Sequence, residues 1–471
     1  MADLSILRKS FSGHLLTEYR EVAPFVTDWR GKWTGKALCV VQPDSTEDVA
    51  HVVRWCHQNK VPVVPQGGNT GLSGGATPDA SGKSLVLSLS RLRRVRCIDI
   101  VNSTITVDAG VTLQEVQEKA REVGRLFPLS LAAQGTCTLG GNLATNAGGV
   151  QVLRYGNARE LCLGLEVVTA QGEVWNGLRG LRKDNTGYDL RDLYIGSEGT
   201  LGIITGATMK LFPLPASQIV AFAAIPNPQA AVDLLQLSQA HFGSGLTGFE
   251  LMNDTCMQLV QKHMPGNRLP LNDRSPWYAL IEMSSANRQD ATQECFQYLL
   301  ECGMERGWIT DAAVSNSLAQ AKAFWALREN ISEAQGAEGK TIKHDISLPI
   351  HAIPHFLSST SEELARKFSF VRMVIFGHMG DGNLHYNASP PEIMAATSSA
   401  VFVESEARMN KVVHDAVDAH GGSISAEHGL GVLRRDEAMR YRSSIETQLM
   451  QTIKTALDPM NLMNPDKVLP C

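Results

Sequence analysis

Residues 61–75 read VPVVPQGGNTGLSGG, a short apolar strand followed by a loop rich in glycine. Two more glycine-rich blocks follow, GTCTLGGNLATNAGG at 135–149 and YIGSEGTLGIIT at 194–205. Glycine lets the backbone approach a ligand closely, and successive backbone N–H groups form a concave site for an anion. The three blocks therefore predict a phosphate-bearing ligand, and purely structural turns are the alternative interpretation.

The two common phosphate-binding motifs do not fit these blocks. Gly82-Lys83-Ser84 matches the end of a P-loop, but Thr77 stands where the first glycine of that motif is required. A Rossmann fingerprint must open a helix, and no helix is predicted after 66–75. The remaining hypothesis is a loop that holds a pyrophosphate through its backbone N–H groups without a helix dipole.

The segments around the glycine-rich blocks alternate between strand and helix patterns. Residues 45–60 predict a helix capped by Ser45 or Thr46. The other predicted elements of this part are strands at 84–89 and 105–111, a helix near 112–123 and a hairpin at 163–175. Residues 211–217, LFPLPAS, contain two prolines and predict a linker.

The chain changes character beyond this linker. Strand patterns at 220–226 and 277–285 alternate with helix patterns near 228–240, 288–303, 317–336 and 401–420. This order predicts an α+β module with an antiparallel sheet and helices on one face. We expect a ligand-binding domain at 1–214, a second domain at 215–425 and a small C-terminal helical segment at 426–471.

Composition excludes several classes of protein. The chain has 471 residues, 43% of them apolar and 19% charged, which is typical of a globular protein with two or three domains. The net charge of -5 gives no basic surface for nucleic acid. The nine cysteines form no C-x-x-C pair, and no long apolar run or signal core is present. These features predict a cytoplasmic protein with reduced thiols and no membrane span.

Residues 377–387, GHMGDGNLHYN, predict a tight hairpin. Residues 379–382 carry turn chemistry between two strand patterns, so position 385 pairs with position 376. This register places His378, His385 and Asn387 on one face of the hairpin. Two imidazoles on one face suit a metal ion. These residues alone leave ordinary polar contacts equally open.

The three glycine-rich blocks, in this order, resemble the FAD-binding domain of the vanillyl-alcohol oxidase/para-cresol methylhydroxylase superfamily, and MNPDKVL at 463–469 resembles its C-terminal flavin-contact segment. The resemblance covers nearly the whole chain and implies a two-subdomain FAD-binding domain followed by an α+β substrate domain. It implies that the following residues bind FAD: Pro65, Gly67, Gly68, Asn69, Thr70, Gly71, Ser73, Pro128, Ser130, Gly135, Thr138, Gly140, Gly141, Asn142, Thr145, Asn146, Gly199, Ile203 and Asn464. Relatives with a covalent flavin often carry a histidine in the first loop, where this chain has Asn69, so we expect dissociable FAD.

The second half resembles the FAD-dependent D-2-hydroxyacid dehydrogenases, and among them the hydroxyglutarate branch. SAEHGLG at 425–431 supplies the third member of a metal set. The resemblance assigns His378, His385 and Glu427 to a divalent metal, with Zn²⁺ expected. It makes His428 the catalytic base that takes the proton of the substrate hydroxyl. A histidine that only orients Glu427 is the competing interpretation.

The resemblance also implies which residues bind the substrate: Arg328, Ser332, Lys343, Asn387 and His428. Arg328 and Ser332 lie four apart in a predicted helix and therefore share a face. Residues 341–349 predict a strand with Lys343 and Asp345 on one face. Arginine suits carboxylates, and a second cation suits a dicarboxylate. Without the resemblance, a surface arginine is the preferred interpretation of Arg328. The other histidines of the chain are interpreted as surface or capping residues.

The implied reaction is oxidation of D-2-hydroxyglutarate to 2-oxoglutarate, with hydride transfer from C2 to flavin N5. The same chemistry on D-lactate or D-malate is the nearest alternative. A metal hydrolase and a flavin-binding protein without turnover are alternatives of other classes. The expected electron acceptor is a flavoprotein or a quinone. A homodimer is compatible with the sequence, which does not fix the oligomeric state.

Overall fold

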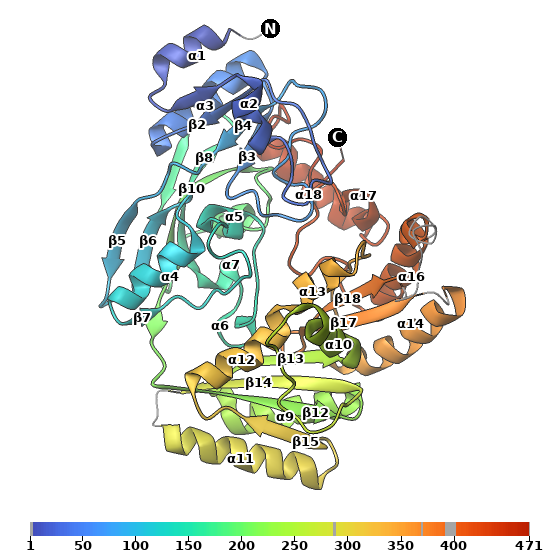
Figure 1. Cartoon of the computed structure of the whole chain (residues 1–471). Helices are drawn as coiled ribbons and strands as arrows, with labels where there is room; N and C mark the ends of the chain where they lie inside the picture. Colours follow the sequence, from blue (N-terminus) through green and yellow to red (C-terminus); the bar gives the residue numbers. More distant parts are fainter. Residues whose placement is uncertain (1–2, 286–288, 369–370, 391–401, 471) are drawn as a thin grey trace. The chain divides into compact units, whose positions relative to one another are not determined.

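The computed structural model describes residues 3–285, 289–368, 371–390 and 402–470, and its chain forms two compact units (Figure 1). The first unit contains Met1–Gly149, Gly156–Leu214 and Glu427–Cys471. The second unit contains Val150–Tyr155 and Pro215–Ala426. The chain therefore leaves the first unit after Leu214 and returns to it at Glu427. Among the described residues, no helix is both long and apolar enough to cross a bilayer.

The first unit is built on two larger sheets. One has the order β1-β2-β4-β3, in which β2, β4 and β3 run parallel, and the other is antiparallel with the order β5-β6-β10-β8-β9. The strands are β1 (His14–Leu16), β2 (Cys39–Gln42), β3 (Val63–Gln66), β4 (Leu85–Ser88), β5 (Val95–Asp99), β6 (Thr104–Asp108), β8 (Cys162–Thr169), β9 (Val174–Gly177) and β10 (Gly202–Lys210), with the short pair β7 (Arg125–Leu126) and β11 (Phe212–Pro213). The predicted strands and the 163–175 hairpin are confirmed.

The helices of the first unit begin where the sequence carries capping residues. Ser45 caps α3 (Thr46–Asn59), and Thr112 and Glu115 form a capping box at α4 (Leu113–Glu122). Both predicted helices are thereby confirmed. The other helices are α1 (Leu4–Ser10), α2 (Tyr19–Val22), α5 (Leu139–Ala144), α7 (Ala158–Leu161), α8 (Leu190–Tyr194), α17 (Arg435–Ala438) and α18 (Ser444–Leu457).

The second unit is an antiparallel sheet with the strand order β15-β12-β14-β13-β17-β18-β16. Its strands are β12 (Ser217–Ile225), β13 (Leu246–Asn253), β14 (Trp277–Ser285), β15 (Asp311–Val314), β16 (Asp345–Ser347), β17 (Arg372–His378) and β18 (Asn383–Ser389). Its helices are α6 (Val152–Tyr155), α9 (Pro228–Phe242), α10 (Asp254–His263), α11 (Gln289–Glu305), α12 (Leu318–Glu329), α13 (Ile331–Ala337), α14 (Ile353–Lys367) and α16 (Glu406–Ala419).

Helices cover both faces of this sheet, so the prediction of helices on one face is wrong. Residues of α10, α12 and α13 share a buried cluster with Val220, Phe222, Tyr278 and Phe376. Helices α9 and α11 also pack against β12, yet they contribute no residue to that cluster. They therefore lie on the opposite face, as the ribbon of the second unit shows (Figure 1).

Two predicted helix boundaries in the second unit also differ from the structure. The predicted helix 317–336 is two helices divided at Asn330, whose side chain contacts Asn267. An asparagine side chain that bonds outside the helix competes with continuous helical bonding. Helix α16, in the predicted helix 401–420, begins at Glu406 after a turn at Ser405, and residue 401 lies outside the described part. Gly421 with φ +70° follows its C-cap, as predicted.

Candidate functional site

The first unit contains a cavity that is bordered by all three glycine-rich blocks. We call it the Gly-rich cavity. The first block contributes Pro65–Gly71 with Ser73, Gly75 and Ala76, and Leu89 lies beside it. The second contributes Cys137, Thr138, Gly140, Gly141, Asn142, Ala144 and Thr145. The third contributes Ser197, Glu198, Gly199 and Gly202–Ile204, and His428 completes the lining.

The cavity fits a ligand that needs close backbone approach. A Cβ atom at Gly68 would lie 2.0 Å from the carbonyl oxygen of Thr136, and one at Gly67 would lie 2.4 Å from Thr138 Oγ1. Only glycine therefore allows the first and second blocks to pack this closely. Asn142 Nδ2 is buried and has no hydrogen-bond partner among the described residues, although buried amides normally have one. A polar ligand atom in the cavity would satisfy it.

Most residues that the sequence assigned to FAD line this cavity. Five do not, namely Pro128, Ser130, Gly135, Asn146 and Asn464. Asn464 donates to the carbonyl oxygens of Gly75 (2.9 Å) and Glu198 (2.8 Å), and its buried Oδ1 has no partner within the described part of the chain. Asn464 therefore joins the first and third blocks from behind the lining.

The loop that carries His428 is attached to the cavity wall by its backbone. Ser73 Oγ lies 3.1 Å from the carbonyl oxygen of His428 and 3.2 Å from that of Gly429. The carboxylate of Glu198 accepts from the N–H groups of Leu430 (2.7 Å) and Gly431 (2.8 Å). These four bonds hold the loop through its backbone.

Glu198 is a residue that the sequence interpretation missed. It is half-buried and takes a positive φ (52°) between Ser197 and Gly199. Burial raises the pKa of the Glu198 carboxyl, and the two N–H groups that it accepts act in the opposite direction. A lone acid inside the apolar block YIGSEGTLGIIT was the available signal.

The second unit contains the predicted histidine hairpin. Strands β17 and β18 pair antiparallel with Phe376 opposite His385, which confirms the predicted register. Gly382 takes φ +85° in the turn, where a Cβ atom would lie 2.3 Å from the carbonyl oxygen of Leu348. The ring centroids of His378 and His385 lie 6.0 Å apart. The hairpin therefore brings the two imidazoles together on one face.

Glu250 on β13 bonds to two of the predicted site residues at once. Its Oε1 lies 2.7 Å from His378 Nδ1, and its Oε2 accepts from Arg328 Nε at 2.6 Å. The side chains of all three are buried, with Glu250 fully so. Burial by itself raises the pKa of Glu250, but attraction to His378 and Arg328 outweighs burial and lowers the pKa to about 2. Glu250 is therefore a carboxylate that stays ionised inside the protein.

Arg328 is not the surface residue of the plain interpretation. It is 8% exposed, and its guanidinium lies over the ring of Phe376 at 4.6 Å. The Phe376 ring centroid lies 4.9 Å from that of His385. Arg328 therefore lies on the hairpin face that carries both histidines. The signal for Glu250, which was missed, was a single carboxylate in the apolar strand pattern LTGFELMN.

Glu427 follows directly on the last residue of the second unit. The N–H of that last residue, Ala426, donates to the carbonyl oxygen of Asp345 (3.2 Å). Asp345 on β16 pairs with His385 on β18, and its carboxylate lies 3.9 Å from His385 Nδ1. Glu427 is thus one peptide bond from a residue anchored beside His385. Two imidazoles and a carboxylate form a donor set that suits a catalytic Zn²⁺.

The segment around Lys343 differs from its prediction, because β16 begins only at Asp345. Ile342 still bridges Ala388, in the same register in which Asp345 pairs with His385. That register places Lys343 opposite Asn387, on the face that carries His385. Asn387 Nδ2 donates to Gln335 (3.0 Å) and its Oδ1 accepts from the N–H of His344 (3.1 Å). Ser332 is exposed near the start of α13.

Two of the remaining histidines are core residues, so their assignment to the surface or to caps is wrong. His344 is 1% exposed and His414 is fully buried, with ring centroids 5.5 Å apart. His344 bonds through Nδ1 to the carbonyl oxygen of Tyr386 (2.8 Å) and through Nε2 to Asn410 (2.9 Å). Strand alternation places His344 on the face opposite Lys343, and this face is buried in the core.

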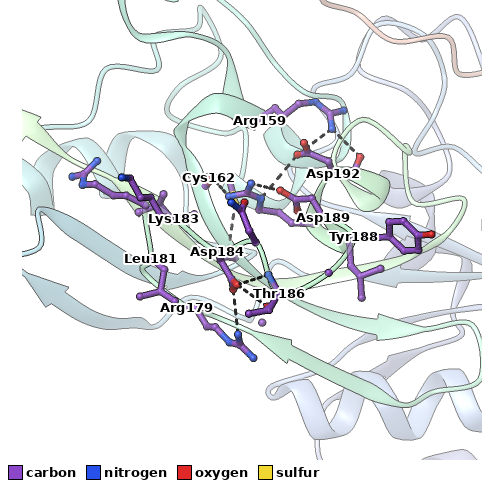
Figure 2. Close-up of a pocket in the computed structure, with 18 of the residues that line it drawn as sticks. Arg159, Cys162, Arg179, Leu181, Lys183, Asp184, Thr186, Tyr188, Asp189 and Asp192 are labelled. Atoms are coloured by element: carbon purple, nitrogen blue, oxygen red, sulfur yellow. Dashed lines mark hydrogen bonds and ion pairs between the residues drawn. The ribbon is translucent and has the colours of Figure 1, made fainter.

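A larger hollow of about 1060 Å³ lies elsewhere in the first unit (Figure 2). None of its lining residues is a predicted site residue or lines the Gly-rich cavity. Its lining residues form ion pairs, including Arg159 with Asp192 (3.3 Å) and Arg179 with Asp184 (3.2 Å). Most of the predicted cofactor-binding residues therefore lie at the Gly-rich cavity, and none lies at this larger hollow.

Comparison with known proteins identifies the family. A model of an FAD binding domain matches residues 37–177, and a model of the C-terminal domain of FAD linked oxidases matches residues 214–468. The D-2-hydroxyglutarate dehydrogenase of Xanthomonas citri pv. viticola is 41% identical over 96% of this chain and 94% of that protein. The mitochondrial D-2-hydroxyglutarate dehydrogenase of Bos taurus is 38% identical over 99% of this chain and 83% of that protein.

Solved structures confirm the predicted fold class. A p-cresol methylhydroxylase with bound substrate matches 97% of this chain and 94% of its own, with a TM-score of 0.74 and 15% identity. At that identity the likeness shows the fold alone. The predicted α+β architecture, an FAD-binding domain followed by a substrate domain, is therefore correct.

The predicted cytoplasmic localisation is contradicted by the names of eukaryotic relatives. The relatives from Bos taurus, Danio rerio and Arabidopsis thaliana are all named as mitochondrial proteins. Free cysteines indicate a reducing compartment without distinguishing one such compartment from another. The chain belongs to the FAD-linked oxidase family, in the branch that contains the D-2-hydroxyglutarate dehydrogenases.

Proposed function

We propose that this FAD-dependent dehydrogenase oxidises D-2-hydroxyglutarate to 2-oxoglutarate with the help of a divalent metal, expected to be Zn²⁺. The family establishes the flavin-dependent oxidation. The observation that carries the rest is the cluster in which one carboxylate, Glu250, joins the carboxylate-binding candidate Arg328 to the metal-ligand candidate His378. The carboxylate and the hydroxyl of a 2-hydroxy acid are neighbours, and the shared contacts of Glu250 with Arg328 and His378 support a site that would receive both.

The Gly-rich cavity would hold the FAD. Its first loop, 67–71, offers backbone N–H groups to the pyrophosphate, and Thr138, Asn142 and Thr145 lie along the second block. Bound flavin supplies the hydride acceptor for the oxidation. The chain's own contribution is a cavity wall in which glycine permits close contact and Asn142 keeps an unused amide for the cofactor.

His378, His385 and Glu427 would hold the metal. Because Nδ1 of His378 contacts Glu250, Nε2 would be its ligand atom. A divalent ion in such a site lowers the pKa of a coordinated hydroxyl. His428, which follows Glu427 in the sequence, lines the Gly-rich cavity. It would take the hydroxyl proton as general base.

Arg328 would bind the carboxylate next to the reacting carbon. Its Nε is used by Glu250, so the two terminal nitrogens of its fork remain for a bidentate contact. Lys343 would bind the distal carboxylate, with Ser332 and Asn387 as further polar contacts. We also propose that electrons leave to a flavoprotein or a quinone.

Anaerobic reduction of the bound flavin tests the function directly. Purified protein should be yellow, and D-2-hydroxyglutarate should bleach it faster than its L-enantiomer, D-lactate or D-malate. Faster bleaching by D-lactate or D-malate would show that this compound is the preferred substrate of the same mechanism. A colourless protein would favour the metal hydrolase, and a yellow protein that no hydroxy acid bleaches would favour the inert flavin binder.

Lys343→Ala is expected to lower kcat/KM for D-2-hydroxyglutarate by roughly ten- to a hundredfold, because a charge-assisted hydrogen bond is worth roughly 1.5–3 kcal/mol. D-lactate has no distal carboxylate, so its kcat/KM should change much less. Lys340→Ala, an exposed lysine three positions earlier, is the matched control. Equal losses on both substrates would show that Lys343 supports the shared carboxylate or the fold instead.

The flavin is expected to be released by acid precipitation. Loop 65–75 contains no histidine, and burial raises the pKa of the Cys137 thiol in the cavity wall, which keeps it unreactive. The yellow colour should therefore appear in the supernatant, where its absorbance is measured. Flavin that stays in the pellet would contradict this prediction, and Cys137→Ala and His428→Ala would then identify the tether.

A further inference from the structure

We propose that Glu250 is a positioning residue that orients the metal ligand His378 and the substrate arginine Arg328 together, an inference that rests on the proposed function. No contact of Glu250 with a reacting atom is invoked. Its two oxygens divide the task, since Oε1 contacts His378 Nδ1 at 2.7 Å and Oε2 accepts from Arg328 Nε at 2.6 Å.

The backbone fixes this arrangement. Glu250 on β13 pairs directly with His378 on β17, so the two side chains leave neighbouring strands at the same level. Arg328 reaches them from the C-terminal turn of α12, and its guanidinium is held against Phe376. Each of the three side chains is buried, so water does not compete for these bonds.

The consequences for the two partners are specific. A carboxylate facing Nδ1 favours the tautomer with hydrogen on Nδ1, which leaves the Nε2 lone pair for a metal. Occupation of Arg328 Nε turns the planar fork so that its terminal nitrogens point away from Glu250. Loss of Glu250 should therefore weaken metal binding and carboxylate binding at the same time.

A glutamine is the informative replacement. An amide has one acceptor oxygen where the carboxylate has two, so Glu250→Gln can satisfy His378 or Arg328 but not both. Glu282→Gln is the matched control. Glu282 is also buried, on the adjacent strand β14, and its carboxylate accepts from Thr247 (2.7 Å), Gln218 (2.8 Å) and Trp325 (2.7 Å). It bonds to neither His378 nor Arg328 in these contacts.

The experiment measures metal affinity by competition of Zn²⁺ with a chromogenic chelator, and KM and kcat on the flavin-loaded enzyme. In Glu250→Gln, the Zn²⁺ affinity should fall by roughly 10–100-fold, or KM for D-2-hydroxyglutarate should rise by a similar factor, or both changes should occur. In an Arg328→Met background, measured at saturating Zn²⁺, the further change of Glu250 should leave KM unaltered. Equal Zn²⁺ affinity and KM in Glu250→Gln and wild type, or equal losses in Glu282→Gln, would overturn the proposal.

Two further readouts separate this inference from the proposed function. Wild-type protein that binds no Zn²⁺ would refute the metal, while the KM comparison would still test the orientation of Arg328. If Glu250→Gln fails to fold, long-range ¹⁵N–¹H NMR on metal-free wild type decides, with the His378 signal assigned from its loss in His378→Gln. Hydrogen on Nδ1 supports the inference, and hydrogen on Nε2 overturns it.

Discussion

Replacing His428 by alanine should slow anaerobic flavin reduction by D-2-hydroxyglutarate by about 10²–10⁴-fold, the usual contribution of a general base. The flavin should stay bound with a native spectrum. The reason is that the loop is attached to the cavity wall through the carbonyl of His428, the Ser73 hydroxyl and the Glu198 carboxylate. Stopped-flow absorbance measures the reduction step separately from reoxidation by the acceptor.

Two controls give this result its meaning. His57→Ala removes a partly buried histidine of α3 that does not line the Gly-rich cavity, and it should leave the rate unchanged. Added imidazole should partly restore His428→Ala, because a small base can take the missing position. The competing interpretation, in which His428 only orients Glu427, requires a loss of Zn²⁺ affinity instead. A normal reduction rate in His428→Ala would refute the assignment.

Features that depend on interactions within one short segment could be predicted from the sequence, and features that depend on distant segments could not. The hairpin that joins His378 and His385 was predictable because its turn residues and its alternating strands lie within one short segment. Family resemblance located most of the Gly-rich cavity for a similar reason, since each block folds as a loop. The helix division at Asn330 was not predictable, because the contact of Asn330 with Asn267 comes from a distant segment.

The residues that were missed have long-range partners. Glu250 acquires its role only when β13 pairs with β17 and α12 packs on the same face. Glu198 acquires its role when the chain returns more than two hundred residues later to supply Leu430 and Gly431. Nothing within either segment identifies the partner, so a lone acid among apolar residues was the strongest signal that the sequence contained.

Removing any one of His378, His385 and Glu427 by alanine substitution is expected to abolish turnover. A metal ion contributes several kcal/mol of charge stabilisation, which corresponds to a loss on the order of a thousandfold or more. The flavin spectrum should remain native in the two histidine variants, because the Gly-rich cavity is lined entirely by residues of the first unit. Metal content per protein, measured by mass spectrometry, should fall with activity.

His355→Ala is the matched control for the metal variants. His355 is an exposed histidine of the second unit that contacts His420 at 2.9 Å, and its loss should change neither metal content nor turnover. Chelation should inactivate the wild type reversibly, and added Zn²⁺ should restore the wild type but not the three variants. If the hairpin histidines made only ordinary polar contacts, His378→Ala would cost stability through the lost bond to Glu250 and leave metal content unaltered. Full metal occupancy in all three variants would therefore remove the metal from the proposed mechanism and leave the flavin, His428 and Arg328 to account for the reaction.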